Sequence, residues 1–298
     1  MATATAPQLL SQLFSVPASE HPRQWDSLYR DAFHPWDRAG PSLALADLLL
    51  QRRDLVPAVP PGERRTALVP GCGLGHDVCL LASFGYDVVG LDVSEAALEE
   101  ARRLQSGVDE QGQYPAQGDV ERGSITWLAA DFFSDEWARG LGTEGSGKFD
   151  LIFDYTVCCL LLLLFLLAHL GVDLSNVRNC QFLCALPTDL RPQWAQRMSD
   201  LLHHKGRLVC LEFPSGKALR EGGPPWGVNP EVYEALLSTP GEPIAYDEQG
   251  DGSVVSIPSP KPRDNALQRL CLVKPPRTHA AGLGEDGSVK DFISVWKF

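Results

Sequence analysis

The pattern that most restricts the fold is an alternation of short apolar runs with amphipathic stretches between residues 64 and 298. The earlier apolar runs are nearly continuous, which is typical of parallel strands buried on both faces. Because helical patterns separate them, we expect a doubly wound α/β sheet. The last two runs are joined by a loop-like segment, which predicts an antiparallel pair closing the sheet. The expected strands are residues 66–69, 86–91, 125–129, 149–154, 207–213, 269–273 and 292–296, and the expected helices are residues 77–83, 95–105, 190–203 and 230–237.

Charge and cysteine usage exclude several classes of function. The formal net charge is −12, so the chain lacks the positive surface of a nucleic-acid-binding protein and would be repelled by anionic membranes. The eight cysteines form no CxxC pair and show no metal-ligand spacing, and several lie in apolar runs. Buried free thiols indicate a reducing compartment. The first twenty residues lack the pattern of a secretory signal. We therefore expect a cytoplasmic protein with a flexible tail over 1–22 and one domain over 23–298.

The segment from residue 25 to residue 53 precedes the first strand and is rich in aromatic residues at its start. Only its end, residues 43–50, has a helical pattern, so we expect the aromatic part not to be a regular amphipathic helix. Two interpretations stay open. The segment either covers the ligand-binding end of the sheet or packs against its outside.

A glycine-rich loop follows the first strand, in the sequence LVPGCGLGHD. Gly71, Gly73 and Gly75 allow positive φ angles and a close approach of the backbone to a ligand. The N-terminus of the following helix offers unpaired N–H groups to an anionic group. Asp92 ends the second strand, 21 residues after Gly71, where a carboxylate can bind both ribose hydroxyls of a nucleoside. This arrangement predicts a nucleoside cofactor.

The glycine spacing separates two cofactor classes. A dinucleotide site uses G-x-G-x-x-G, whereas Gly75 comes only two residues after Gly73. This spacing favours S-adenosylmethionine (SAM), which has no pyrophosphate. Asp131 follows the third strand and could bind the adenine amino group, with Phe132 against the ring. An NAD-type oxidoreductase remains the weaker alternative, as does a protein in which the glycines form turns and the acids cap helices.

Six segments in order resemble one known family: Trp25…HisProTrp36Asp, LVPGCGLGHD, VVGLDVS, FDLIFDYT, FLCALP and GGPPW. They are similar to the thiol and halide methyltransferases in the thiopurine S-methyltransferase-like branch of SAM-dependent enzymes. The resemblance implies a seven-stranded Rossmann-like methyltransferase sheet with an antiparallel last strand. It also implies that the acceptor is a small thiol, hydrosulfide, thiocyanate or a halide ion. In that family the residues that line the SAM site match Trp25, Trp36, Gly71, Asp92, Asp131, Phe132 and Tyr155.

The expected acceptor pocket is aromatic and apolar. We place Trp36, Phe182 and Phe213 against the acceptor, and we assign Tyr155 to its orientation. Methyl transfer from a sulfonium requires alignment of the nucleophile and exclusion of water. Anionic acceptors need no general base, and we expect none.

Residues 157–181, VCCLLLLLFLLAHLGVDLSNVRNCQ, interrupt the family pattern after Tyr155 and Thr156. A membrane-spanning helix is one interpretation, but the apolar run of twelve residues would span only about 18 Å of a bilayer core of about 30 Å. A buried inserted helix is a second. We favour a third, a translated intron, because removal of these 25 residues restores a continuous DYT-FLCALP. A transcript that encodes the segment would contradict this hypothesis. The same segment raises the alternative that the chain is an inactive or misfolded variant.

Overall fold

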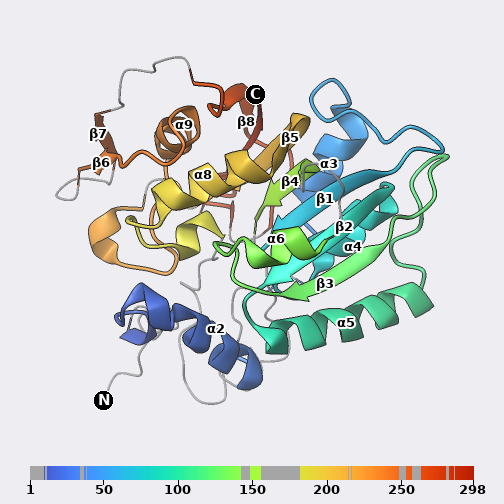
Figure 1. The fold of residues 1–298 in the computed structure, drawn as a ribbon, viewed down its shortest axis with the longest axis horizontal. Helices are drawn as coiled ribbons and strands as arrows, with labels where there is room; N and C mark the ends of the chain where they lie inside the picture. The colour runs from blue at the N-terminus through green and yellow to red at the C-terminus, as the bar shows by residue number, and fades with distance from the viewer. Residues whose placement is uncertain are drawn as a thin grey trace.

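The computed structural model describes residues 10, 12–33, 37, 39–141, 148–155, 182–213, 215, 217–247, 253–256, 263–279, 282–284 and 286–298. A seven-stranded sheet crosses this part of the chain in the order β3-β2-β1-β4-β5-β9-β8 (Figure 1). Strands β1 to β5 run parallel, and β9 is antiparallel to both β5 and β8. The predicted doubly wound sheet with an antiparallel last strand is confirmed. The strands are β1 (Arg65–Pro70), β2 (Tyr86–Asp92), β3 (Ile125–Ala129), β4 (Phe149–Asp154), β5 (Leu202–Glu212), β8 (Gln268–Val273) and β9 (Phe292–Lys297).

Helices cover both faces of this sheet, which explains why its central strands are apolar on both sides. Within β1, Val69 packs toward one face and Leu68 toward the other, because successive side chains of a strand alternate. One face carries α3 (Leu43–Gln51), α4 (His76–Ser83) and α5 (Glu95–Glu110). The other carries α6 (Glu136–Gly140), α8 (Arg191–Leu201) and α9 (Pro230–Ser238). A separate two-stranded sheet, β6 (Ala245–Tyr246) and β7 (Val254–Ser256), lies beside α9 (Figure 1).

The aromatic N-terminal segment forms a regular helix, α2 (His21–Arg30), so our expectation of an irregular segment is wrong. His21, Leu28 and Tyr29 are buried, and Trp25 lies on the same side. These positions follow the spacing of one helical face. The expectation considered only the residues from 25 onward. The helix begins four residues earlier, with Pro22 in its first turn, so part of its apolar face was not counted.

Part of the segment that we expected to be a tail packs on the domain. Leu10 and Phe14 are buried, and the ring of Phe14 lies 4.4 Å from that of Trp25 and 5.0 Å from that of His21. The short helix η1 (Ala18–Glu20) leads directly into α2. The chain before α2 therefore contributes to the same aromatic cluster as the helix itself.

The indole of Trp127 occupies a space left by two glycines. A Cβ atom on Gly75 would lie 2.1 Å from the ring, and one on Gly90 would lie 2.6 Å from it. The indole nitrogen donates to Gln105 Oε1 of α5 at 2.7 Å. Gly75 also has a φ of +77° at the start of α4. The two glycines therefore allow β3 and α5 to pack closely against the glycine loop.

Residues 157–181 lie outside the described residues, but the chain on either side of them meets in space. Asp154 ends β4 and is buried. Burial raises the pKa of its carboxyl to about 7, and the nearby Leu183 backbone and Trp194 side chain act in the opposite direction. The end of β4 therefore lies next to Leu183 and Trp194, which follow the segment 157–181 in the chain. Among the described residues, no helix is long and apolar enough to cross a membrane.

Replacement of Gly75 by alanine should destabilise the protein by about 2–5 kcal/mol. A side chain in left-handed backbone costs about 1–2 kcal/mol, and forcing extra volume against Trp127 costs about 1–3 kcal/mol. Urea unfolding measures the difference. Gly40→Ala is the matched control, because a Cβ there meets no atom within 4 Å. Equal stability of the two variants would contradict the packing argument.

We propose that residues 157–181 are dispensable for folding. A chain that lacks them should unfold at a temperature no lower than that of the full chain, since each halving of a connection lowers its closure cost by about 0.6 kcal/mol. Circular dichroism and thermal unfolding test this. A second variant that carries a short Gly-Ser linker in their place guards against strain at the junction. If both shortened chains fail to fold, the segment is part of the core.

Candidate active site

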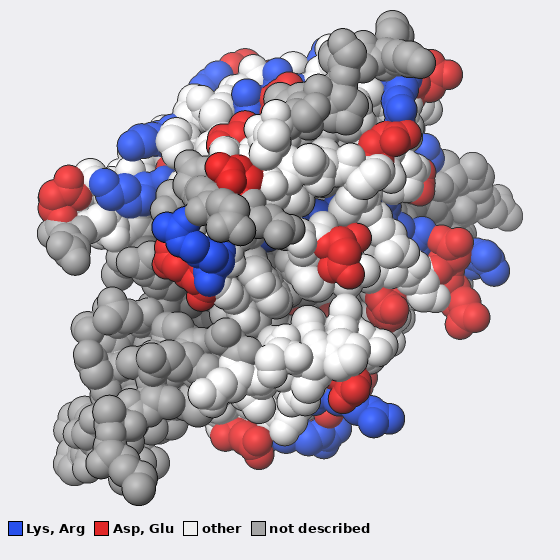
Figure 2. All heavy atoms as spheres, turned by 90° about the vertical axis from the view of Figure 1, so that its left-hand side faces the viewer, with Lys and Arg blue, Asp and Glu red and all other residues white. Residues whose placement is uncertain are grey.

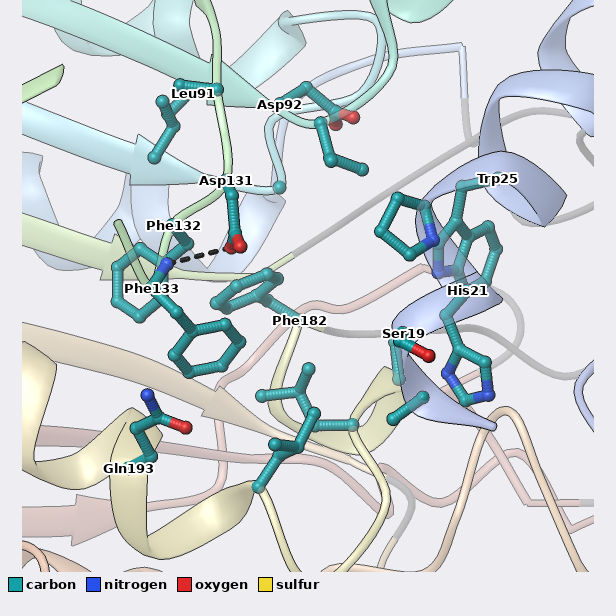
Figure 3. Close-up of a pocket in the computed structure, with 18 of the residues that line it drawn as sticks. Ser19, His21, Trp25, Leu91, Asp92, Asp131, Phe132, Phe133, Phe182 and Gln193 are labelled. Atoms are coloured by element: carbon teal, nitrogen blue, oxygen red, sulfur yellow. Dashed lines mark hydrogen bonds between the residues drawn. The ribbon is translucent and has the colours of Figure 1, made fainter. Parts of the chain in front are cut away.

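A pocket of about 520 Å³ lies at the carboxyl ends of β1, β2 and β3, within the size range of small-molecule sites, about 300–1,000 Å³. The strand order reverses at this edge, because β1 is followed on one side by β2 and on the other by β4. Ligands of open α/β sheets bind at such a position. Figure 3 shows the strand-end residues Leu91, Asp92, Asp131 and Phe132 facing α2 across the pocket.

The carboxylate of Asp92 is the best-defined polar group of the pocket. Its Oδ2 accepts the backbone N–H of Gly73 and its Oδ1 accepts that of Ser94, both at 2.9 Å. Burial raises the pKa of this carboxyl, and the two N–H groups act in the opposite direction. A carboxylate oxygen can accept more than one hydrogen bond, so each oxygen keeps an acceptor position beside the pocket. This is the group that two neighbouring hydroxyls of a ribose require.

The three glycines of the loop have different positions. All have positive φ angles, +61° at Gly71, +53° at Gly73 and +77° at Gly75. Gly71 lines the pocket, Gly73 binds Asp92 through its N–H, and Gly75 makes room for Trp127. Of the three glycines predicted to contact the cofactor, Gly71 therefore lines the pocket itself, and Gly73 acts on the pocket through Asp92.

The loop after β3 forms the next part of the wall. Asp131, Phe132 and Phe133 all line the pocket, and Asp131 Oδ1 accepts the N–H of Phe133 at 2.9 Å, the dashed line in Figure 3. The Phe132 ring meets that of Phe182 edge to face, with 5.0 Å between the centroids. Phe182 therefore contributes to the pocket as predicted, next to the candidate adenine-binding residues.

An arginine of α8 fixes this loop, and sequence reasoning missed it. Arg197 Nε donates to the carbonyl of Phe132 at 3.0 Å, and Nη2 donates to that of Ser134 at 2.6 Å. The guanidinium also pairs with Asp135. Sixty-two or more residues separate these groups along the chain, so no local pattern indicates the contact.

Helix α2 and the η1 helix before it form the opposite wall, where Ser19, His21 and Trp25 line the pocket (Figure 3). Asp26 Oδ1 accepts the hydroxyl of Ser94 at 2.9 Å and the N–H of Ala96 at 3.3 Å. Burial opposes ionisation of Asp26, but hydrogen bonds from Arg30, Ser94 and Ala96 outweigh it and lower its pKa. The structure thus supports the first of the two interpretations, in which this segment covers the ligand-binding end.

Two predicted aromatic contacts are not brought to this pocket. Tyr155 is buried, and its ring stacks on His279 with 6.3 Å between the centroids. Phe213 is also buried and does not line the pocket. Asp154 points toward the face that carries α8, so its neighbour Tyr155 points toward the other face. Trp36 lies outside the described residues.

Trp25 was predicted and lines the pocket, whereas several other lining residues were not predicted. His21 lies one helical turn before Trp25, a signal that appears once α2 is known to begin at residue 21. Phe133 and Gln193 also line the pocket. Among the described residues, no cluster of three or more His, Cys, Asp or Glu side chains could hold a metal ion. On the face drawn in Figure 2, acidic and basic side chains are interspersed.

The polar and aromatic groups that line the pocket fit a nucleoside with an attached amino-acid chain. Asp92 and Asp131 are the carboxylates of the lining, Phe132 and Phe182 supply ring faces, and Gly71 leaves the backbone accessible. Such a pocket binds a molecule with hydroxyl and amino donors and apolar surface. SAM carries all of these groups, so the residues present fit the cofactor that the sequence predicts.

Comparisons with known proteins agree with this fit. A family model described as thiopurine S-methyltransferase matches residues 20–162 and 166–256. A probable thiol methyltransferase 2 of Arabidopsis thaliana is 33% identical, over 78% of this chain and 80% of the relative. Thiocyanate methyltransferase 1 of Brassica oleracea is 32% identical, over 78% of this chain and 79% of the relative.

One solved structure extends the comparison to the fold. A SAM-dependent methyltransferase from Anabaena variabilis superposes with a TM-score of 0.51 and 15% identity, and the match covers all of this chain and 98% of the other. At this identity the likeness concerns the fold alone. The family match over most of the chain goes further. The chain belongs to the thiopurine S-methyltransferase family and is a SAM-dependent methyltransferase.

Proposed function

We propose that this chain transfers the methyl group of SAM to a small sulfur nucleophile, such as a thiol, hydrosulfide or thiocyanate, or to a halide ion. The observation that carries the proposal is the composition of the pocket. Two carboxylates lie at the strand ends, and the wall around Phe182 and Trp25 is largely aromatic and aliphatic. The names of the two plant relatives, which refer to a thiol and to thiocyanate, support the same acceptor class.

In this proposal the strand-end residues hold the cofactor. Asp92 binds the ribose hydroxyls with the acceptor positions that Gly73 and Ser94 leave open. Asp131 binds the adenine amino group, with Phe132 against the ring. When bound, SAM supplies a methyl group attached to a positively charged sulfur. Membership of the methyltransferase family decides against the oxidoreductase alternative.

The wall opposite the strand ends holds the acceptor. Trp25 and Phe182 exclude water from the space between α2 and the loop after β3. An acceptor that loses its hydration shell there becomes a stronger nucleophile, and the aromatic faces also favour a neighbouring positive charge. Trp36 keeps its proposed place in this wall. Tyr155 and Phe213 are buried outside the pocket lining, so neither is given a contact with the acceptor.

The Asp92→Ala variant should bind SAM at least about 100-fold more weakly, because each hydrogen bond to a charged group contributes about 1.5–3 kcal/mol. Isothermal titration calorimetry measures the affinity. Asp87→Ala is the matched control, since Asp87 lies on the same strand and accepts two hydrogen bonds from Ser124, away from the pocket. Equal SAM affinity in both variants, with both folded, would remove Asp92 from the site.

Release of S-adenosylhomocysteine from SAM tests the acceptor. Iodide, thiocyanate, hydrosulfide and an alkanethiol are supplied in turn to the full chain and to the chain without residues 157–181. We expect turnover with at least one sulfur acceptor by the shortened chain. Activity of the shortened chain alone would identify the full chain as an inactive variant. Binding of SAM without turnover of any of the four acceptors would contradict the proposed acceptor class.

A further inference from the structure

A histidine of α2 lines the pocket, and the proposed function has not used it. His21 is 8% exposed and lies in the same lining as Gly71, Asp92 and Trp25. Figure 3 places its imidazole on the α2 side, across the pocket from Asp131 and Phe132. The strand-end residues are assigned to the cofactor, so His21 belongs to the wall that faces the acceptor.

The surroundings of the ring fix which nitrogen carries the proton. Nε2 lies 3.2 Å from the carbonyl oxygen of Val16. A carbonyl can only accept, so Nε2 is the donor and Nδ1 of the neutral ring is an acceptor. Among the described residues, none is hydrogen-bonded to Nδ1. The ring is thus held with an acceptor nitrogen that a pocket ligand can use.

Two aromatic rings hold the imidazole in this orientation. Phe14 meets it edge to face, with the centroids 5.0 Å apart and an interplanar angle of 86°. Trp226 stacks on it at 6.4 Å and 13°. The loop of Trp226 is itself fixed, because its N–H donates to the carbonyl of Cys184 at 2.8 Å. Val16, Phe14 and Trp226 therefore hold the imidazole in place before a methyl acceptor binds.

The charged groups near His21 are few. Phe14 and Trp226 are uncharged. Lys217 belongs to the loop of Trp226, and its ammonium donates to the carbonyls of Gly222 and Pro225. The carboxylates that share the pocket are Asp92 and Asp131, and Glu20 precedes His21 in the chain.

Acceptors of the proposed class differ in whether they carry a proton. Thiocyanate and iodide are anions already, whereas an alkanethiol is largely protonated at neutral pH and reacts as the thiolate. We propose that His21 is the general base for protonated thiol acceptors, an inference that rests on the proposed function. The S–H bond of the thiol breaks, and its proton passes to Nδ1. The electron pair left on the thiol sulfur forms the new S–C bond to the methyl group, while the pair of the broken methyl–sulfonium bond leaves with S-adenosylhomocysteine. The imidazolium keeps its Nε2–H on Val16 and afterwards releases one proton to water per methyl group transferred.

The His21→Gln variant tests this inference. The glutamine amide can still donate to the Val16 carbonyl, but it cannot take up a proton. kcat/KM is measured from pH 6 to pH 10 with ethanethiol and with thiocyanate. At pH 7 we expect a loss of roughly 100-fold with ethanethiol, the lower range for general bases, and no loss with thiocyanate. The loss should shrink as the pH approaches the pKa of the thiol.

His204→Gln is the matched control. His204 lies on β5, packs against the ring of Phe298 and does not line the pocket. SAM affinity by calorimetry provides a readout that does not depend on turnover, and it should be unchanged in both variants. Equal losses with ethanethiol and thiocyanate, or weakened SAM binding, would give His21 a structural role. An unchanged rate with ethanethiol would also overturn the inference. If the wild-type enzyme methylates neither acceptor, the proposed function fails, and the inference fails with it.

Discussion

The pocket depends on the hydrogen bonds that converge on the Asp92 carboxylate and continue through Ser94. Asp92 binds the N–H groups of Gly73 and Ser94, which ties the glycine loop to the end of β2. The Ser94 hydroxyl accepts the N–H of Ala97 and donates to Asp26, which ties the start of α5 to α2. One chain of bonds therefore sets the positions of the glycine loop and of the helix that lies across the pocket from it.

The second half of the pocket is fixed by groups on α8 and at the end of β4. Arg197 holds the carbonyls of Phe132 and Ser134, and Asp154 faces the Leu183 backbone and the Trp194 side chain. The guanidinium of Arg197 is buried, and these bonds offset the cost of removing it from water. The aromatic wall between them can then remain apolar, because its backbone is positioned by bonds made outside the pocket.

The sheet could be predicted from the sequence because burial on both faces leaves a continuous apolar signal. Strands β3 and β4 have the expected bounds, while β5 begins at Leu202, five residues before the expected start, in a polar stretch without that signal. Asp92, Asp131 and Gly71 were predicted because strand ends converge on one edge. Contacts between distant elements, such as that of Arg197 with the loop after β3, leave no local pattern. Tyr155 and Phe213 follow strands at the carboxyl edge of the sheet, but neither lines the pocket.

The meeting of Asp154 with Leu183 has a consequence for the connectivity of the enzyme. Strands β4 and β5 lie on opposite sides of the interval 156–181, yet they are adjacent parallel strands in the middle of the sheet. A polypeptide cut within that interval would yield two fragments that share one sheet and one hydrophobic core on each face. The pocket carboxylates Asp92 and Asp131 would come from the first fragment, and Phe182 and Arg197 from the second. The active site is in this sense a junction between two separable halves, which makes this interval the natural place to divide the protein into complementing pieces.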